Sequence, residues 1–266
     1  MPKYTARTAD KHMLYQIAVQ SPEAEVDFIE RVYRQTYGKA PTLFREDFCG
    51  TALISCAWAS VRRANHAYGV DLHKPTLDWG LEHNVRRLPT EAASRVHLLN
   101  KNVLHVARPR VHAVGAFNFS YFIWKDFPQL VRYFRGVRRA LLPEGLFVLD
   151  AYGGWEAQEV MEEETKLRGF TYVWHQAEYN PVNDHTVCHI HFKFPDGSVM
   201  RKAFTYDWRL WTLGAIRDAL VQAGFASTDV HWEGTTRQGE GNGVYRRTCK
   251  AENLPGWNAY ITALPG

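Results

Sequence analysis

The chain has 266 residues, a length that predicts one large domain or two small ones. Hydrophobic residues make up 45% of it and charged residues 23%, which excludes a wholly disordered chain. The net charge of +4 permits an anionic ligand without demanding nucleic acid. We expect no membrane partner, because no apolar stretch is long enough for a spanning helix. Four cysteines without a CxxC pair, and no secretory signal, favour a cytoplasmic location.

The predicted elements alternate between helix and strand over the first 151 residues. Ser21 and Pro22 predict the start of a helix that ends at Gly38. Strands are then predicted over 41–48, 66–71, 95–100, 111–119 and 146–151, and helices over 51–64, 75–87 and 127–142. Such alternation indicates right-handed βαβ units and a parallel sheet.

The pattern changes in the last third of the chain. Three strand-like runs over 170–179, 185–194 and 199–206 are separated by turn residues and predict an antiparallel meander. A helix over 212–223 and strands over 226–232 and 244–250 follow, and these two strands are close enough in sequence to pair antiparallel. Residues 253–266 show no readable structure.

These elements predict an α/β fold. Its centre is a doubly wound, Rossmann-like, mostly parallel sheet of seven strands, with a C-terminal antiparallel strand pair and an inserted antiparallel meander. The predicted parts are an N-terminal helical segment (1–40), a core (41–169 and 207–250), the meander (170–206) and a C-terminal tail (251–266).

The strongest functional signal is the segment EDFCGTA (46–52) between the first core strand and the next helix. A strand that ends in a glycine turn at a helix N-terminus presents backbone N–H groups and a positive dipole end to a ligand. The second strand ends in Asp71, whose carboxylate can accept hydrogen bonds from both ribose hydroxyls. Together they predict a nucleoside-containing cofactor. The dinucleotide fingerprint G-x-G-x-x-G is absent, which disfavours NAD and FAD, and the P-loop motif is absent as well.

At these residues the chain resembles the class I S-adenosylmethionine-dependent methyltransferases. The first motif of that family is an acidic residue followed by G-C-G-T-G. The chain matches it at Glu46, Cys49, Gly50 and Thr51, and has Phe48 and Ala52 in place of glycines. Asp71 matches the ribose-binding acid of the family, and LLPEG (141–145) resembles its L-x-P-G-G motif.

The resemblance implies S-adenosyl-L-methionine as the cofactor, and no metal. The cofactor-binding residues that it implies are Tyr15, Glu46, Phe48, Cys49, Gly50, Thr51, Asp71, Leu72, Asn102, Val103, Asn118 and Phe119. Asn102 stands where the family usually has an aspartate against the adenine amino group. Asn118 and Phe119 end the fourth strand, in the substrate-facing motif. Tyr15 lies in an N-terminal segment that covers the cofactor in similar methyltransferases; an amphipathic helix packed on the sheet is the alternative.

Methyl transfer needs alignment of nucleophile, methyl group and sulfur more than covalent help from the protein. An amine must be neutral to attack, so a base would assist, and Tyr121 and His189 are the candidate catalytic residues. His185, His189 and His191 share one face of their strand because their spacing is even. Three histidines could bind zinc, but solvated imidazoles on a paired strand are the preferred interpretation.

The function predicted is methyl transfer to a nitrogen or oxygen of a small molecule. One alternative is an RNA or nucleic-acid methyltransferase of the same fold, suggested by the arginines of 132–139, whose spacing does not form one stripe. Another is a catalytically silent protein that binds the cofactor and a partner protein. The sequence leaves open the methyl acceptor and whether the chain forms a homodimer.

Overall fold

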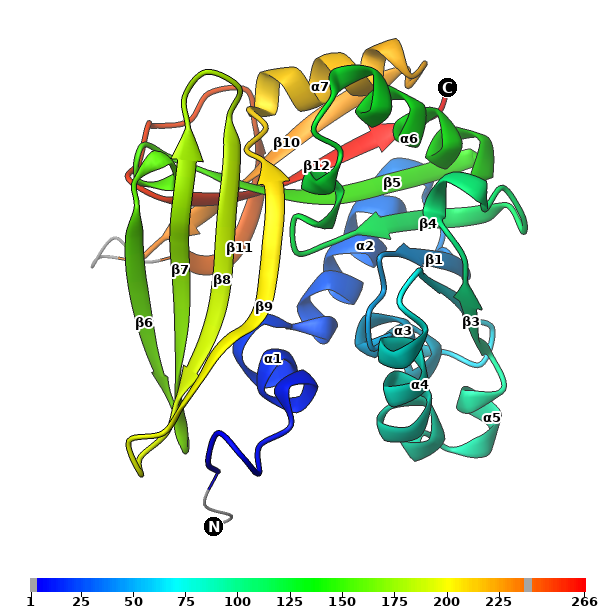
Figure 1. Ribbon diagram of the computed structural model, residues 1–266. Coiled ribbons are helices and arrows are strands. Elements are labelled where there is room, and N and C mark those ends of the chain that lie inside the picture. The colour runs from blue at the N-terminus through cyan, green and yellow to red at the C-terminus, as the bar shows by residue number, and fades with distance from the viewer. Residues whose placement is uncertain (1–3, 237–240) are drawn as a thin grey trace.

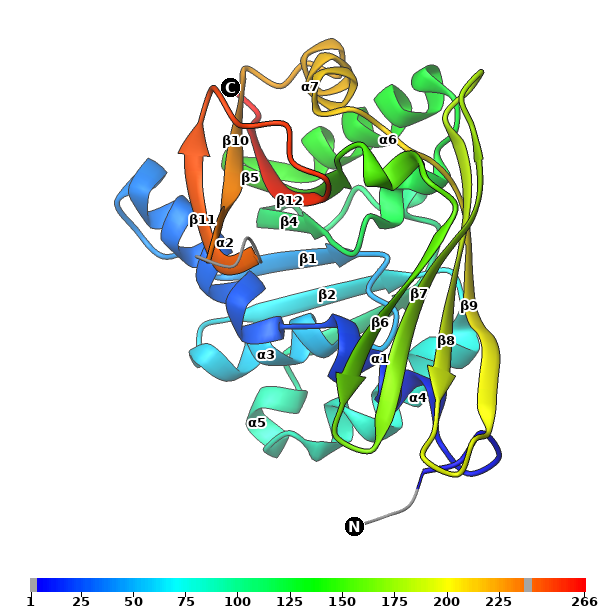
Figure 2. The same cartoon turned by 90° about the vertical axis from the view of Figure 1, so that its left-hand side faces the viewer.

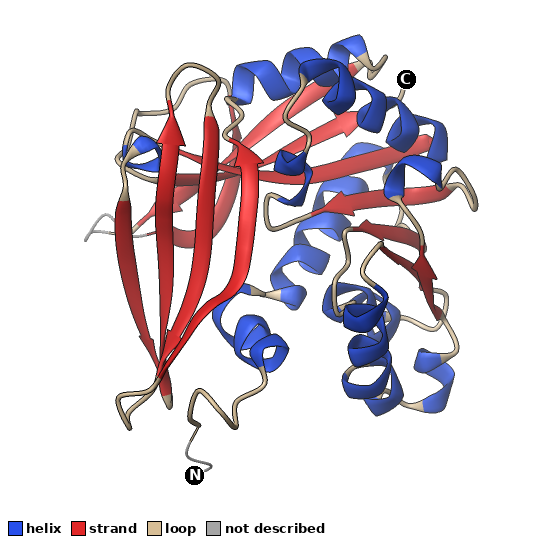
Figure 3. Ribbon diagram, viewed as in Figure 1, coloured by secondary structure: helices blue, strands red, loops and turns tan. Residues whose placement is uncertain are grey.

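A computed structural model describes residues 4–236 and 241–266 and contains two sheets (Figure 1). Helices flank the larger sheet, and the smaller antiparallel sheet stands beside it (Figure 3). The helices are α1 (Lys11–Val19), α2 (Pro22–Tyr37), α3 (Leu53–Val61), α4 (Lys74–His83), α5 (Thr90–Ala93), α6 (Phe127–Ala140) and α7 (Leu213–Gln222). Short 3₁₀ turns are η1 (Val85–Arg87), η2 (Val103–His105), η3 (Ser120–Ile123) and η4 (Glu156–Gln158).

The larger sheet has the strand order β11-β10-β12-β5-β4-β1-β2-β3. Its strands are β1 (Leu43–Asp47), β2 (His66–Asp71), β3 (Val96–Asn100), β4 (Val111–Ala116), β5 (Leu141–Gly153), β10 (Ser227–Thr235), β11 (Gly241–Thr248) and β12 (Trp257–Leu264). Strands β1 to β5 are parallel, and β10 to β12 pair antiparallel. The chain order reverses at β1, so the carboxyl ends of β1 and β4 flank a switch point of the sheet. The predicted fold class is therefore confirmed.

The C-terminal part of the sheet differs from the prediction. The predicted pair is present as β10 and β11, but β12 lies between β10 and β5, so the sheet has eight described strands and not seven. The tail that showed no readable structure thus supplies an internal strand. Residues 259–263 are buried, and a strand covered on both faces is nearly all apolar and lacks the alternation that marks half-buried strands.

The smaller sheet has the order β6-β7-β8-β9, and we call it the inserted sheet. Its strands are β6 (Met161–Leu167), β7 (Phe170–Asn180), β8 (His185–Lys193) and β9 (Val199–Arg209). The three predicted runs are present, and β6 is an additional edge strand. Its sequence, MEEETKL, is charged and mostly exposed, which is a usual composition for a protected sheet edge. The inserted sheet therefore spans 161–209, beyond the predicted limits of 170–206.

Helix α1 packs on the inserted sheet and not on the parallel one. Leu14 is fully buried there, in a cluster with Ile190 and Phe192 of β8. Asp10 caps α1 and accepts a hydrogen bond from Trp79 Nε1 of α4 at 2.8 Å. The helix therefore lies between the inserted sheet and the helices around β2, as Figure 2 shows. Among the described residues, no helix is long and apolar enough to cross a membrane.

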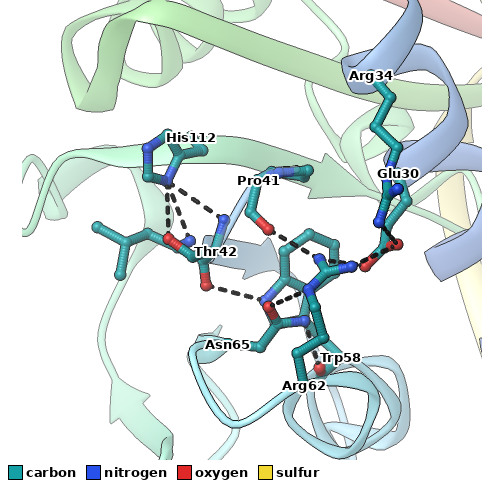
Figure 4. Close-up of polar contacts among 9 residues, drawn as sticks. Glu30, Arg34, Pro41, Thr42, Trp58, Arg62, Asn65 and His112 are labelled. Atoms are coloured by element: carbon teal, nitrogen blue, oxygen red, sulfur yellow. Dashed lines mark hydrogen bonds and ion pairs between the residues drawn. The ribbon is translucent and has the colours of Figure 1, made fainter. Parts of the chain in front are cut away.

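The amino-terminal side of β1 is fixed by the polar network drawn in Figure 4. Arg62, just after α3, pairs with Glu30 of α2 at 2.5 Å and donates to the carbonyl of Pro41 at 3.0 Å. Trp58 Nε1 donates to the carbonyl of Thr42 at 3.3 Å. These bonds hold α2 and α3 against β1 and leave its carboxyl end free for a ligand.

Candidate functional site

The loop between β1 and α3 has a left-handed backbone at three alternate residues. The φ angles are 58° at Phe48, 52° at Gly50 and 57° at Ala52. The resembled motif has glycine at all three positions, because a left-handed conformation costs other residues about 1–2 kcal/mol. The chain therefore keeps the path of a three-glycine loop with only one glycine.

The two parts of the predicted cofactor signature meet in space. The backbone N–H of Gly50 donates to Asp71 Oδ2 at 2.9 Å, and the N–H of His73 donates to Asp71 Oδ1 at 2.7 Å. A carboxylate has about four acceptor positions, so Asp71 retains capacity for further donors. A Cβ atom at Gly50 would meet nothing nearer than Thr76 Cγ2 at 3.9 Å. The backbone of the loop is thus open to a ligand at this point.

Thr51 is held from two helices. Gln16 of α1 donates to its hydroxyl at 2.7 Å, and Asn84 after α4 donates to its carbonyl at 2.8 Å. A Cβ atom at Gly80 would lie 2.4 Å from the same carbonyl oxygen, so only glycine lets α4 approach the loop this closely. The N-terminal segment is therefore bonded directly to the candidate cofactor loop.

Three other residues of the motif face the protein interior. Glu46 is buried and accepts hydrogen bonds from the N–H and the hydroxyl of Ser55 at 2.8 and 2.6 Å, so it anchors the start of α3. Burial raises the pKa of Glu46 to about 8 and raises that of the buried Cys49 thiol. The ring of Phe48 packs against Tyr133, with ring centroids 5.5 Å apart. We assign these three side chains to positioning the loop.

The residues predicted to surround the adenine occupy three different environments. Asn102 caps the η2 turn by accepting from the N–H of Leu104 at 2.9 Å. Val103 is buried in the core. Leu72 is 69% exposed although it is large and apolar. Of these three, Leu72 has the free apolar surface that a stacked base would cover.

The turn after β4 is strained in the same way as the loop after β1. Asn118 and Phe119 have φ angles of 55° and 57°. Their N–H groups donate to the carboxylate of Asp150 at 2.6 and 2.9 Å, which holds the turn in place. Burial raises the pKa of Asp150 to about 7. Strain that neighbouring groups maintain is common at functional sites.

A cavity of about 820 Å³ opens in front of this turn, between the inserted sheet and the ends of β4 and β5. Its walls are aromatic and include Tyr15 of α1, Phe119, and Tyr172, Trp174, Tyr206 and Trp208 of the inserted sheet. The rings of Tyr206 and Trp208 stack with centroids 4.3 Å apart. A cavity of this size, lined by aromatic rings with polar side chains among them, suits a small molecule. Of the predicted cofactor residues, Tyr15, Asn118 and Phe119 line it.

Comparison with solved structures identifies the fold. The chain is similar to an S-adenosylmethionine-dependent methyltransferase from Clostridium acetobutylicum (TM-score 0.68, 16% identity, 96% of this chain and 98% of that one). It is also similar to S-adenosylmethionine-bound CalS10, an amino pentose methyltransferase from Micromonospora echinaspora (TM-score 0.65, 14% identity, 95% of each chain). A third similar structure is that of the sugar N-methyltransferase KedS8 from Streptoalloteichus (TM-score 0.63, 18% identity, 96% of this chain and 92% of that one). No protein-family model matches, and no curated protein is significantly similar in sequence.

The chain has the class I methyltransferase fold. The resemblance drawn from 46–52 and Asp71 is thus confirmed at the level of the fold. Within this methyltransferase fold the candidate cofactor loop, Asp71 and the aromatic cavity all lie at the carboxyl edge of the parallel strands, where α/β sheets bind their ligands.

The structure places neither of the predicted catalytic residues in the lining of the cavity. Tyr121 is fully buried, and its hydroxyl donates to the carbonyl of Asp150 at 2.7 Å. His189 is also buried and does not line the cavity, whereas its neighbour Ile190 does. Successive residues of a strand face opposite sides, so the histidine face of β8 is turned away from the cavity. A catalytic role for either residue therefore stays a prediction.

The histidine face is poorly suited to zinc. Potential ligand atoms that lie within 4.8 Å of one another come from Glu162, His175 and His191. The N–H of Lys202 donates to His191 Nδ1 at 2.8 Å, so the proton of the neutral ring is on Nε2, which is 3.2 Å from His175 Nδ1. A metal-bound histidine normally donates from its second nitrogen, whereas His191 accepts there. His191 therefore caps the left-handed bulge at Lys202.

Sequence reasoning missed the aromatic walls. The cavity lining does not include Trp124 or Trp155. The residues that do are spaced by two within strands, as in Tyr172 with Trp174 and in Tyr206 with Trp208. Aromatic residues at alternate positions of two meander strands were the available signal, because alternate residues share one face.

Proposed function

We propose that the protein is an S-adenosyl-L-methionine-dependent methyltransferase that transfers a methyl group to a nitrogen or oxygen of a small molecule. The observation that carries this proposal is the 2.9 Å bond between Gly50 N–H and Asp71, made at the same sheet edge as the aromatic cavity. The solved structures of the same fold support it, because they include sugar N-methyltransferases and one with S-adenosylmethionine bound.

The residues present fit this cofactor. Asp71 would accept from the ribose hydroxyls, Leu72 would cover one face of the adenine, and the open backbone at Gly50 would face the methionyl part. The cofactor supplies an activated methyl group on a sulfonium. Tyr15 and the turn at Asn118 would separate cofactor from acceptor, because both line the cavity.

The protein's contribution to the reaction is mainly alignment. The inserted sheet forms one wall of the cavity, the turn after β4 forms the opposite one, and Asp150 holds that turn rigid. Aromatic walls keep water from the reacting atoms. Orientation of two reactants in such a site can remove up to about 7–11 kcal/mol of the barrier.

Calorimetric titration with S-adenosylhomocysteine tests the proposal. We expect stoichiometric binding by the wild type and at least about a tenfold loss of affinity in Asp71→Ala, equivalent to about 1.4 kcal/mol. Asp78→Ala is the matched control, because Asp78 is an exposed residue of α4 that pairs with Lys74 and makes no contact with the loop. A wild-type protein that does not bind the nucleoside would refute the proposed cofactor.

A further inference from the structure

The charged groups that line the cavity all have one sign. Glu156 of η4, Glu163 of β6 and Glu233 of β10 are its ionisable acids, and no lysine, arginine or histidine is among the described residues around it. The chain as a whole carries 32 lysines and arginines against 28 acids, a net charge of +4. The negative cavity is therefore a local feature that opposes the overall charge.

Among the described residues, no cation forms an ion pair with these three carboxylates. The ion pairs in the described part of the chain involve other acids, including the neighbouring Glu162 and Glu164 on β6. Glu233 accepts a hydrogen bond from the N–H of Gly243 at 2.9 Å and is also hydrogen-bonded to the side chain of Tyr245, neither of which is a cation. Three carboxylates that have no ion-pair partner in the described part of the chain create a negative potential, which attracts cations and repels anions.

The aromatic walls strengthen this selectivity. Trp174 and Trp208 have ring centroids 6.3 Å apart, and Trp174 lies 6.0 Å from Tyr206. Ring faces attract cations with about 0.5–2 kcal/mol per contact, and indole is the strongest of them. A cavity lined by carboxylates, indoles and phenols is suited to an organic ammonium group.

We propose that the acceptor of this site is a cationic amine, and that acceptors carrying a carboxylate or phosphate group are rejected. The inference rests on the proposed function and specifies its substrate class. Glu156 and Glu163 are the specificity-determining residues, and the site would select nitrogen over oxygen as the methylated atom. An acceptor with a nucleotide diphosphate would bring at least two negative charges against three carboxylates.

In the transfer step, the bound ammonium first loses one proton to a carboxylate of the cavity or to solvent, which frees the nitrogen lone pair. That lone pair forms the new N–C bond while the C–S bond breaks and its electron pair stays on sulfur. The product is an N-methylammonium ion, which retains the charge that the carboxylates bind.

A charge series of equal-sized probes tests the inference. We would titrate 2-phenylethylamine, 2-phenylethanol and phenylacetate into the protein saturated with S-adenosylhomocysteine and measure each Kd by ligand-observed NMR. We expect the amine to bind at least about tenfold more tightly than the alcohol, phenylacetate to bind most weakly, and added salt to reduce the difference. Equal affinities for amine and alcohol, or no binding of the amine, would overturn the inference.

Variants of adjacent residues on β6 provide the control. Glu163→Gln should reduce the preference for the amine about fivefold, and Glu156→Gln with Glu163→Gln should reduce it further. Glu164→Gln should leave it unchanged, because Glu164 faces away from the cavity and pairs with Lys193 at 2.5 Å. Calorimetry with S-adenosylhomocysteine on the same samples separates the two proposals. If the nucleoside binds and the amine is not preferred, the substrate class is wrong and the proposed cofactor stands.

Discussion

At the scale of single residues, backbone strain marks the candidate site. Six described non-glycine residues have a left-handed backbone, and four of them follow β1 or β4: Phe48, Ala52, Asn118 and Phe119. Each such residue costs about 1–3 kcal/mol and persists only where its surroundings hold it. Asp150 does so for the turn after β4, and Gln16 and Asn84 do so for the loop after β1.

Ala52 tests the strain in the cofactor loop. Its φ of 57° and full burial leave no room for a β-branched side chain. We expect Ala52→Val to lower the free energy of unfolding by more than about 2 kcal/mol, and Ala52→Gly to lower it by less than about 1 kcal/mol. Denaturant unfolding measures both. Ala57→Val in the middle of α3 is the control and should cost no more than about 0.7 kcal/mol. Equal losses at 52 and 57 would show that the loop is not strained.

Buried acids without cationic partners make the stability depend on pH. Burial raises the pKa of Glu25 and of Glu46 to about 8 and that of Asp150 to about 7, and repulsion by Asp150 and Glu46 adds to the rise at Glu25. An acid whose pKa is higher in the folded state binds its proton more tightly there. Its stabilising contribution is present at low pH and is lost as the pH rises toward the folded pKa.

We therefore expect the free energy of unfolding of the cofactor-free protein to fall between about pH 6.5 and pH 8. His231, whose pKa burial lowers to about 4, acts in the opposite direction, but its effect is complete above its ordinary pKa of about 6.5. Glu25 is 8% exposed and its Oε2 has no hydrogen-bond partner, so it is the simplest group to remove. Glu25→Gln should flatten the dependence by up to about 1.4 kcal/mol per pH unit. Urea unfolding across this range checks it, and an unchanged slope contradicts it.

At the scale of elements, α1 joins the two candidate binding regions. Leu14 packs on the inserted sheet, Gln16 bonds to the cofactor loop, and Tyr15 lines the cavity. These three side chains are consecutive on α1, yet they reach three different surroundings. These contacts are consistent with α1 covering the site, which stays a prediction for the N-terminal segment.

The bond from Gln16 to Thr51 is the part of α1 that a variant can isolate. We expect Gln16→Ala to weaken S-adenosylhomocysteine binding about three- to tenfold and to speed hydrogen exchange in residues 11–19, because one hydrogen bond contributes about 0.5–1.5 kcal/mol. Ile17→Ala is the control, since Ile17 lies on the same helix and is 53% exposed. Calorimetry and exchange mass spectrometry give the two readouts. Affinity equal to that of wild type would separate α1 from the site.

At the scale of the whole molecule, β12 connects the C-terminal strands to the parallel sheet. Because β12 lies between β5 and β10, it joins the β10–β11 hairpin to the core. Ile261 is fully buried and belongs to the main core cluster. Ile261→Ala should lower the free energy of unfolding by about 2–5 kcal/mol. Asn258→Ala on the exposed part of β12 should change it by less than about 0.5 kcal/mol. Thermal unfolding of the two variants measures both changes. Similar losses of unfolding free energy in the two variants would place β12 outside the core.

The sequence by itself determined the local patterns. The alternation of helices and strands, the segment 46–52 and the position of Asp71 at a strand end were enough to predict the sheet and the edge that carries the candidate site. These signals are local because helix caps, glycine turns and side-chain periodicity depend on neighbours in the chain. The contact between Gly50 and Asp71 follows from parallel strands whose ends meet at one edge.

Only the tertiary structure decided which face of each strand meets the cavity. The even spacing of histidines on β8 placed them together, but packing against α1 turned Ile190 inward and His189 outward. It also buried Tyr121, and it placed residues 257–264 inside the sheet. The periodicity of a strand fixes which residues share a face, whereas burial of that face depends on elements distant in sequence.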